Sequence, residues 1–283
     1  MTRRPGRRSG GSGELDPTGI AAIDRLAGLP VCTIEDYIAA VSAYVRDSRM
    51  LKGGPKKAAQ IRLSNALGRA LVDELKAKLP TMADVMVGER KVAGALRTTK
   101  ADVSEIHELD GLRLAVELKP VNLAVGRAIW NRFGDLRTFA VNIHLKFPFA
   151  VVGGVLVIPT YEESGTGEAQ EAEAIEESAE EGADHSESHE GNSRAPNPPA
   201  SAAGRATVKS TRHLIDRAVQ RLIRAGGRKT EADAAHLLEG IAVVAYDPNT
   251  SKVDPDLPPV GSGLRWDEFI TALTTAYAAR FEG

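Results

Sequence analysis

Cysteine is almost absent from this sequence, which has one such residue, Cys32, among its 283. A single thiol excludes a disulfide within the chain and a zinc site built from cysteines. Long hydrophobic runs are also absent, since no stretch reaches the roughly eighteen apolar residues that a membrane-spanning helix needs. The first residues carry arginine without an apolar run behind it, so a secretory signal is not expected. We therefore expect a cytoplasmic protein without a membrane partner.

The charge of the chain is unevenly distributed. The formal net charge is −2, but the stretch from Glu162 to Glu190 holds eleven Glu and one Asp and has no Lys or Arg. Without that stretch, 36 basic residues stand against 26 acidic residues, a net charge of +10. A basic folded part suits a protein that meets phosphate backbones, although Lys and Arg that only solvate a surface give the same balance.

Composition divides the chain into four parts. Residues 1–18 are rich in Gly, Arg, Ser and Pro and are predicted to form a disordered basic tail. Residues 162–206 are acidic and then rich in Ser, Ala, Asn and Pro, which predicts a disordered insertion. Residues 19–161 should fold as N-terminal helices and a core. Residues 207–283 should add a helix, a strand and a helix to the same domain.

Hydrophobic periodicity predicts an α/β fold with a mixed central sheet flanked by helices. The strand at 149–159 is apolar throughout and should be buried on both faces. The helix from 122 to 133 ends near Gly134 or continues to His144. Helices are predicted at 33–50, 55–79, 122–133, 208–225 and 266–281, and strands at 92–96, 103–109, 112–119, 149–159 and 240–246.

A hairpin between residues 102 and 119 carries the main chemical signal. Asp110-Gly111 lies between two alternating strands, a strong signal for a tight turn. On the second strand Glu117 and Lys119 share one face, because successive side chains alternate. A two-residue turn would place Asp102 opposite Lys119 and diagonal to Glu117. The three polar groups should therefore converge at the end of the hairpin far from the turn.

Two carboxylates beside an ammonium suit phosphodiester hydrolysis. Carboxylate oxygens are ligands that Mg²⁺ prefers, and Mn²⁺ is an alternative ion. A bound ion polarises a phosphodiester and lowers the pKa of a bound water. An ammonium at the position of Lys119 can orient that water or stabilise charge on the phosphate.

Asp102 followed by Glu117-Leu118-Lys119 on the next strand resembles the PD-(D/E)xK nuclease core of many type II restriction endonucleases. The resemblance covers residues 55–160, about a third of the chain, and implies a restriction-endonuclease-like core of a helix, three strands, a helix and a strand. It implies that Asp102 and Glu117 are metal ligands and that Lys119 is the catalytic lysine. Ala101 stands where the family's motif has proline, a position that varies.

Other interpretations of these residues remain open. A surface hairpin with a cross-strand salt bridge would carry the same three side chains. Asp110 is nearer to Glu117 along the chain, but a turn position suits a shared metal badly. Glu74, on the preceding helix, is a candidate accessory acid because related nucleases place one there, and otherwise a solvated helix residue. Candidate DNA-backbone contacts on the following helix are Arg127, Arg132 and Arg137, which equally suit a solvated face.

We therefore expect a magnesium-dependent endonuclease that hydrolyses double-stranded DNA. A sequence-specific restriction enzyme acting as a homodimer is the leading hypothesis, because two-fold symmetry lets two sites address two strands. One alternative keeps the fold but makes it a nuclease for repair, or for structured or modified DNA or RNA. The other is a non-catalytic nucleic-acid-binding or regulatory protein. The recognition sequence and the cleavage pattern are not encoded in any motif found here.

Overall fold

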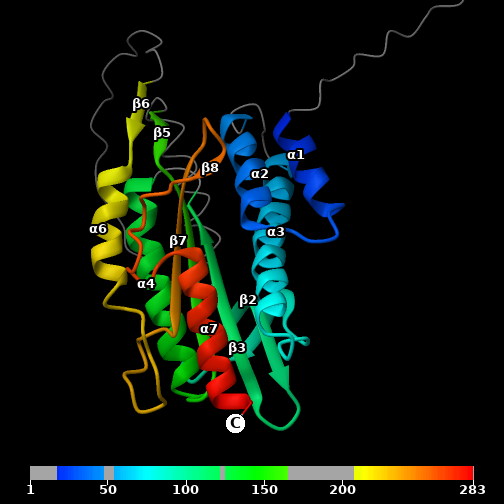
Figure 1. The fold of residues 1–283 in the computed structure, drawn as a ribbon, viewed down its shortest axis with the longest axis vertical. Coiled ribbons are helices and arrows are strands. Elements are labelled where there is room, and N and C mark those ends of the chain that lie inside the picture. The colour runs from blue at the N-terminus through cyan, green and yellow to red at the C-terminus, as the bar shows by residue number, and fades with distance from the viewer. Residues whose placement is uncertain (1–17, 48–53, 122–124, 165–206, 283) are drawn as a thin grey trace, which may run out of the picture.

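A computed structural model describes residues 18–47, 54–121, 125–164 and 207–282 (Figure 1). No helix within those ranges is both long and apolar enough to cross a membrane. The elements run in the order α1 (Thr18–Ala27), α2 (Ile34–Asp47), α3 (Gly54–Lys78), β1 (Met86–Ala93), β2 (Thr98–His107), β3 (Gly111–Pro120), α4 (Val125–His144), β4 (Val151–Pro159), β5 (Tyr161–Ser164), β6 (Thr207–Ser210), α6 (Arg212–Leu222), β7 (Gly240–Asp247), β8 (Lys252–Val253) and α7 (Trp266–Phe281).

A mixed sheet of six strands forms the centre of the fold, in the spatial order β1-β2-β3-β4-β7-β8. Strands β1, β2 and β3 are antiparallel neighbours. β4 and β7 continue the sheet in parallel, and β8 closes it as a short antiparallel edge. The predicted α/β fold with a mixed central sheet flanked by helices is thus confirmed.

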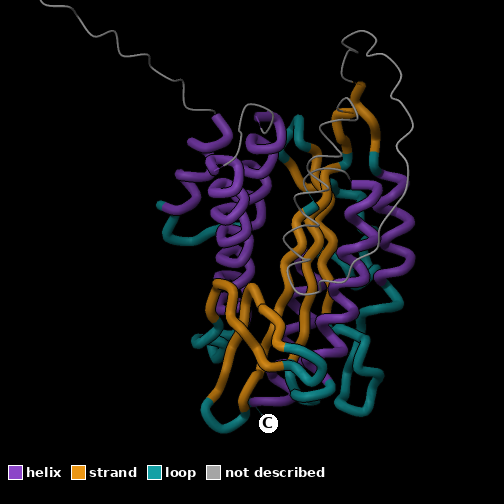
Figure 2. The backbone as a smooth tube through the Cα atoms, turned by 180° about the vertical axis from the view of Figure 1, so that it is seen from behind, coloured by secondary structure: helices purple, strands orange, loops and turns teal. Residues whose placement is uncertain are grey.

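Helices cover the two faces of the sheet as two separate layers. Leu67, Leu71 and Leu75 of α3 pack with residues of α1, α2 and α7 against one face. Ile129 and Leu136 of α4 pack with residues of α6 against the other. Figure 2, seen from behind, shows the α4 and α6 pair on the right of the sheet and the α1 to α3 layer on the left. Each face of the sheet therefore has its own hydrophobic core, and the sheet separates the two cores.

The first strand differs from its prediction. The structure places β1 at Met86–Ala93, whereas the sequence pattern predicted residues 92–96. The reason is that the turn between β1 and β2 is held by hydrogen bonds to a residue of α4. The side-chain oxygen of Asn142, on α4, accepts hydrogen bonds from the backbone N–H groups of Leu96 and Arg97, at 2.8 and 3.1 Å. Those residues are thereby held in the connection to β2.

A buried charge cluster lies at the amino-terminal ends of the parallel strands β4 and β7. The Glu239 side chain is fully buried and accepts hydrogen bonds from Arg228, Arg280 and the backbone N–H of Val152. Burial alone would raise the pKa of Glu239, but His144 and Arg280 outweigh it and lower that pKa. The cluster ties α4, β4, β7 and α7 together, so its role is structural.

The predicted insertion begins later than composition indicated. Residues 162–164 lie in β5, and residues 207–210 form β6, whereas the sequence pattern assigned 162–206 to the insertion and a helix to 208–225. The two strands pair antiparallel, from Tyr161 with Ser210 to Ser164 with Thr207. Residues 165–206 lie outside the described residues, as do residues 1–17 of the tail predicted at 1–18, whose last residue, Thr18, instead begins α1. The chain therefore leaves and re-enters the fold at two adjacent positions.

Because Ser164 and Thr207 are paired neighbours, we predict that residues 165–206 can be removed without unfolding the protein. We expect a variant in which a short Gly-Ser turn joins Ser164 to Thr207 to keep its melting temperature within a few degrees. Its affinity for DNA at low salt should rise, because a tethered polyanion that competes with phosphates is gone. Thermal unfolding followed by circular dichroism, beside DNA-binding titrations at two salt concentrations, provides the check. Loss of the cooperative unfolding transition would show that these residues belong to the folded core.

Candidate active site

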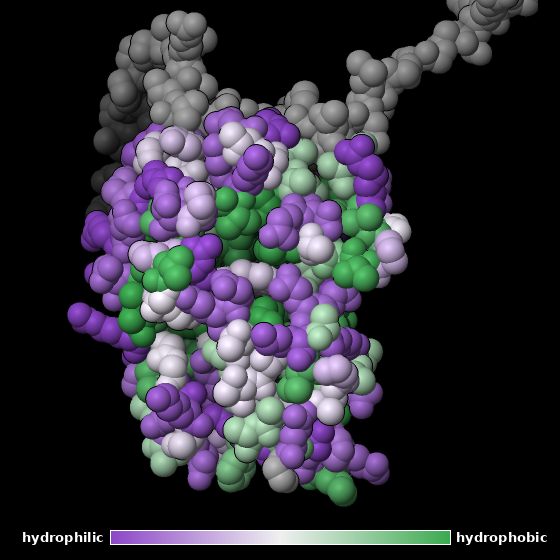
Figure 3. Space-filling view, in the orientation of Figure 1, coloured by the Kyte–Doolittle hydropathy of each residue, from purple (hydrophilic) through white to green (hydrophobic). Residues whose placement is uncertain are grey.

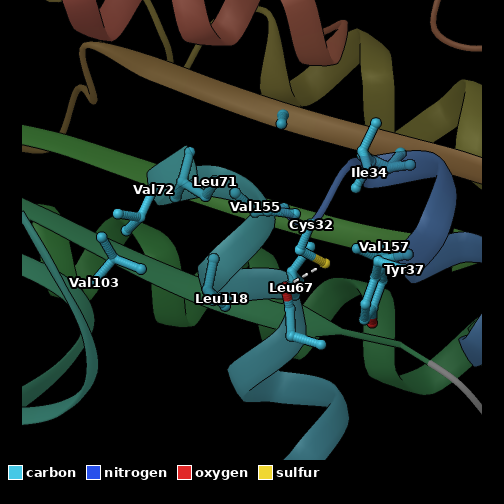
Figure 4. Close-up of a cluster of buried hydrophobic side chains, with 14 of the residues drawn as sticks. Cys32, Ile34, Tyr37, Leu67, Leu71, Val72, Val103, Leu118, Val155 and Val157 are labelled. Carbon is cyan, nitrogen blue, oxygen red and sulfur yellow. Dashed lines mark hydrogen bonds between the residues drawn. The ribbon is translucent and has the colours of Figure 1, made fainter. Parts of the chain in front are cut away.

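The β2–β3 hairpin directs its side chains to two faces. Val103 and Leu118 point into the core beneath α3, where they lie near Leu71 and Val72 (Figure 4). Side chains alternate along a strand, so Glu117 and Lys119, on either side of Leu118, face the opposite layer, that of α4. Asp102 lies beside them, since its carboxylate accepts the backbone N–H of Leu118 and its charge acts on Glu117. Burial of the apolar neighbours thus fixes the direction of the polar ones.

The register of the hairpin differs from the predicted one by two residues. Val103 pairs with Val116, so the next step along the strands brings Asp102 opposite Glu117, not opposite Lys119. Two features cause the shift. The turn has three residues, Glu108 to Asp110, between the paired His107 and Gly111, where two were predicted. The register then shifts again between Glu105 and Ile106. At the site end of the hairpin the net shift of two leaves Glu117 and Lys119 on their predicted face, whereas near the turn Leu112 lies in the other core from Leu114 and Val116.

The three polar groups meet where β2 and β3 separate. Described pairing of the two strands ends at Val103 and Val116, although both strands continue beyond that point. There the Asp102 carboxylate, in place of a backbone carbonyl of β2, accepts a hydrogen bond from the backbone N–H of Leu118, at 2.6 Å. The ammonium of Lys119 lies 2.7 Å from a carboxylate oxygen of Glu117. The side chains of Glu117 and Lys119 are 14% and 21% exposed, so both are mostly shielded but remain open to solvent.

Burial dominates the electrostatics of this cluster. It raises the pKa of Glu117 to about 7, with a further upward contribution from Asp102 that Lys119 only partly offsets. Burial also raises the pKa of Asp102, against the opposing effects of the Leu118 N–H and Lys119. For Lys119 burial acts downward, but the Glu117 and Asp135 carboxylates outweigh it and the pKa of the ammonium rises. One ammonium therefore does not offset the burial of both carboxylates.

Helix α4 adds a second ion pair beside the cluster. Arg132 lies 3.3 Å from Asp135, and both side chains are partly shielded. The charge of Asp135 raises the pKa of both Glu117 and Lys119, while Arg132 acts in the opposite direction on Lys119. α4 comes this close because Gly154 is the β4 neighbour of Glu117, and a Cβ there would lie 2.8 Å from a methyl carbon of Leu136. Asp135 is a site neighbour that the sequence pattern did not indicate.

The remaining candidates lie apart from the cluster. Glu74 is on α3, across the sheet, where Trp266, Glu35 and Asp267 are among the groups that act on its carboxyl. Arg127 is exposed near the start of α4. Arg137 lies over the ring of Phe133, with its guanidinium carbon 5.9 Å from the ring centroid. Of the three candidate arginines, only Arg132 faces the cluster.

The donor set fits a hard divalent cation with few protein ligands. Within the described part of the chain there is no group of three or more His, Cys, Asp or Glu side chains arranged to hold a metal. Asp102 and Glu117 offer two carboxylates whose pKa values are raised chiefly by burial, which Lys119 only partly offsets. Mg²⁺ is commonly held by one or two carboxylates, with waters and substrate phosphate oxygens completing its shell.

A cavity of about 260 Å³ lies away from this cluster. It opens between the start of α2 and the segment that carries β8, and its lining includes Ile34, Val253, Leu257 and Trp266. Figure 3 shows apolar side chains in a hollow of that region, on the face opposite α4. The cavity does not reach Asp102, Glu117 or Lys119 and has no part in the chemistry considered for them.

Comparisons of the chain with models of known protein families, with curated protein sequences and with solved structures returned no match. The interpretation of the site consequently depends on its own geometry and chemistry.

Proposed function

We propose that this protein is a magnesium-dependent DNA endonuclease of the PD-(D/E)xK type. The convergence of Asp102, Glu117 and Lys119 on one face, at the point where β2 and β3 separate, carries the proposal. A second support is the order α3-β1-β2-β3-α4-β4, with two antiparallel pairs and then a parallel one. That order is what the resemblance to restriction endonucleases implies.

Each side chain has a distinct task in the proposed reaction. Asp102 and Glu117 would hold Mg²⁺, which would supply Lewis-acid polarisation of the phosphodiester and a more acidic bound water. Lys119 donates hydrogen bonds to the attacking water or to a phosphate oxygen, where negative charge grows as the P–O bond breaks. Water supplies the new P–O bond and the leaving oxygen takes up a proton. The charge of Asp135, which pairs with Arg132, favours the ammonium form of Lys119 from the side of α4.

A sequence-specific restriction enzyme is the form of this function that we favour. Cutting both strands requires two such sites, which a two-fold symmetric homodimer would provide. Incubation with several unmethylated DNAs in Mg²⁺ or EDTA, followed by mapping of the fragment ends, tests the proposal. Ends at recurring sequences support a restriction enzyme, and scattered or structure-dependent ends support a repair-type nuclease. Binding without cleavage in any divalent metal would leave only a non-catalytic DNA-binding protein.

The raised pKa of Glu117 predicts pH-dependent metal binding. Below pH 7 this carboxyl is mostly protonated and a poor ligand, and above pH 7 it is ionised, so Mg²⁺ affinity should rise with pH. With a pKa of about 7, the affinity at pH 6 should be roughly tenfold lower than at pH 8. Isothermal titration of DNA-free protein with Mg²⁺ at the two pH values measures it, with Glu117→Gln as the control that should lose most of the difference. Equal affinities for the wild type would contradict this role for Glu117.

A further inference from the structure

Two helices on the candidate-site side of the sheet carry four exposed arginines that form no ion pair with any other described residue. Trp130 of α4 lies beneath two guanidinium groups of α6, with Arg221 and Arg217 at 4.5 and 5.7 Å from its ring centroid. Arg137 lies over Phe133 one turn further along α4. Arg127, Arg137, Arg217 and Arg221, with these two rings, are called here the arginine surface.

The arginine surface exposes its positive charge to solvent. All four arginines are exposed, whereas Trp130 and Phe133 are partly buried against the core beneath. None of the four forms an ion pair with a carboxylate in the described part of the chain, unlike Arg132. Asp216 is the only acidic residue of α6, and Asp135 the only one of α4. A solvated helix face more often mixes charges of both signs, so this segregation points to an anionic partner.

The arginine surface and the candidate site occupy opposite flanks of α4. Arg132 and Asp135 adjoin Glu117 and Lys119 on one flank. Trp130 is contacted by α6 on the other, and both flanks belong to the same side of the sheet (Figure 2). A helix with its side chains is about 10–12 Å across, so the two flanks lie about one helix diameter apart. One duplex that lies across α4 would therefore meet both flanks.

We propose that the arginine surface binds the phosphate backbone of the same DNA duplex whose scissile phosphate lies at Lys119. This proposal rests on the proposed nuclease function for the position of the duplex. The guanidinium groups over Trp130 and Phe133 are held in place by the rings, so less side-chain freedom is lost when they meet phosphates. The contact is with the backbone, so it sets affinity and position and leaves the recognition sequence unaffected.

The test compares charge removal on two faces of the full-length protein. The first variant is Arg217→Gln with Arg221→Gln. The matched control is Arg25→Gln with Lys78→Gln, two exposed cations on α1 and α3 in the other layer. Affinity for a duplex of about thirty base pairs is measured in EDTA over a range of salt, by fluorescence anisotropy. The single-turnover cleavage rate is measured in Mg²⁺ at saturating protein.

Loss of the two arginines should weaken metal-free binding roughly tenfold and reduce the salt slope by about two, while the control binds as the wild type does. The cleavage rate at saturation should stay close to that of the wild type. Arg217→Lys with Arg221→Lys should recover most of the salt slope, because the charge is restored. Unchanged affinity and slope in the glutamine variant, both in the full chain and with residues 165–206 removed, would overturn the proposal. If the wild type binds DNA but never cleaves it, the nuclease function fails, while a weakened glutamine variant still supports the arginine surface.

Discussion

Lys119→Ala should lower the single-turnover cleavage rate about a hundredfold or more, while DNA affinity stays nearly unchanged. The ammonium lies 2.7 Å from Glu117, inside a mostly shielded cluster, so it contributes little to attracting DNA from solution. Its stabilising effect grows only as charge develops on the phosphate oxygens. The measurement is single-turnover cleavage in Mg²⁺ beside metal-free binding titrations of the same variant.

Lys100→Ala provides the matched control for this prediction. Lys100 is on the same hairpin, two residues from Asp102, but its ammonium is exposed and pairs with Glu89 at 2.6 Å. Its removal should change the cleavage rate by only a few-fold. A different result for Lys119→Ala, namely weaker binding and a salt slope reduced by about one with an unchanged rate at saturation, would make Lys119 a simple phosphate contact.

Glu117→Ala should abolish metal-dependent cleavage, with a rate loss on the order of a thousandfold or more. The reason is that Glu117 supplies one of the two carboxylates proposed to hold the metal, and among the described residues no third His, Cys, Asp or Glu is placed to hold the same ion with them. Metal-free DNA binding should stay equal or become tighter, because a negative charge that faces the phosphate is removed. Mg²⁺ titration of the DNA-free variant should show weakened binding in parallel with the lost cleavage.

Glu74→Ala serves as the comparison for Glu117→Ala. Glu74 is also a shielded acid with a raised pKa, owing chiefly to burial, but it lies in the opposite helical layer. We expect this variant to cleave DNA at nearly the wild-type rate. Equal losses in the two variants would indicate that either substitution acts through damaged folding, which thermal unfolding of both proteins would reveal.

Elements with a strong local signal were predictable from the sequence. Phe269, Leu273 and Tyr277 recur at helical spacing, and α7 has the predicted bounds Trp266–Phe281. The apolar run before Pro159 is β4, which is buried along its whole length. The common face of Glu117 and Lys119 was also predictable, because alternation along this part of β3 depends on local geometry alone.

Features set by packing between distant segments were not predictable. The pairing partner of Asp102 depended on a register shift between Glu105 and Ile106, which no residue type marks. The proximity of Asp135 to Glu117 required α4 to pack closely over Gly154, and α4 to continue unbroken through Gly134. Strands β5 and β6 are four residues each and pair across more than forty residues of chain, beyond the reach of any local pattern.

Asp102→Asn tests most directly whether Asp102 of β2 acts with Glu117 and Lys119 of β3 as one active site. The amide oxygen of asparagine can still accept the Leu118 N–H, so the hairpin should keep its geometry while one metal-binding carboxylate is lost. The measurement is a time course of DNA cleavage by the wild type and this variant in Mg²⁺, with EDTA for each and with metal-free binding as the test of integrity. We expect the wild type to cut only in Mg²⁺, and the variant to bind DNA without cutting it. Cleavage by Asp102→Asn at the wild-type rate would contradict the assignment of Asp102, Glu117 and Lys119 as one metal-dependent active site.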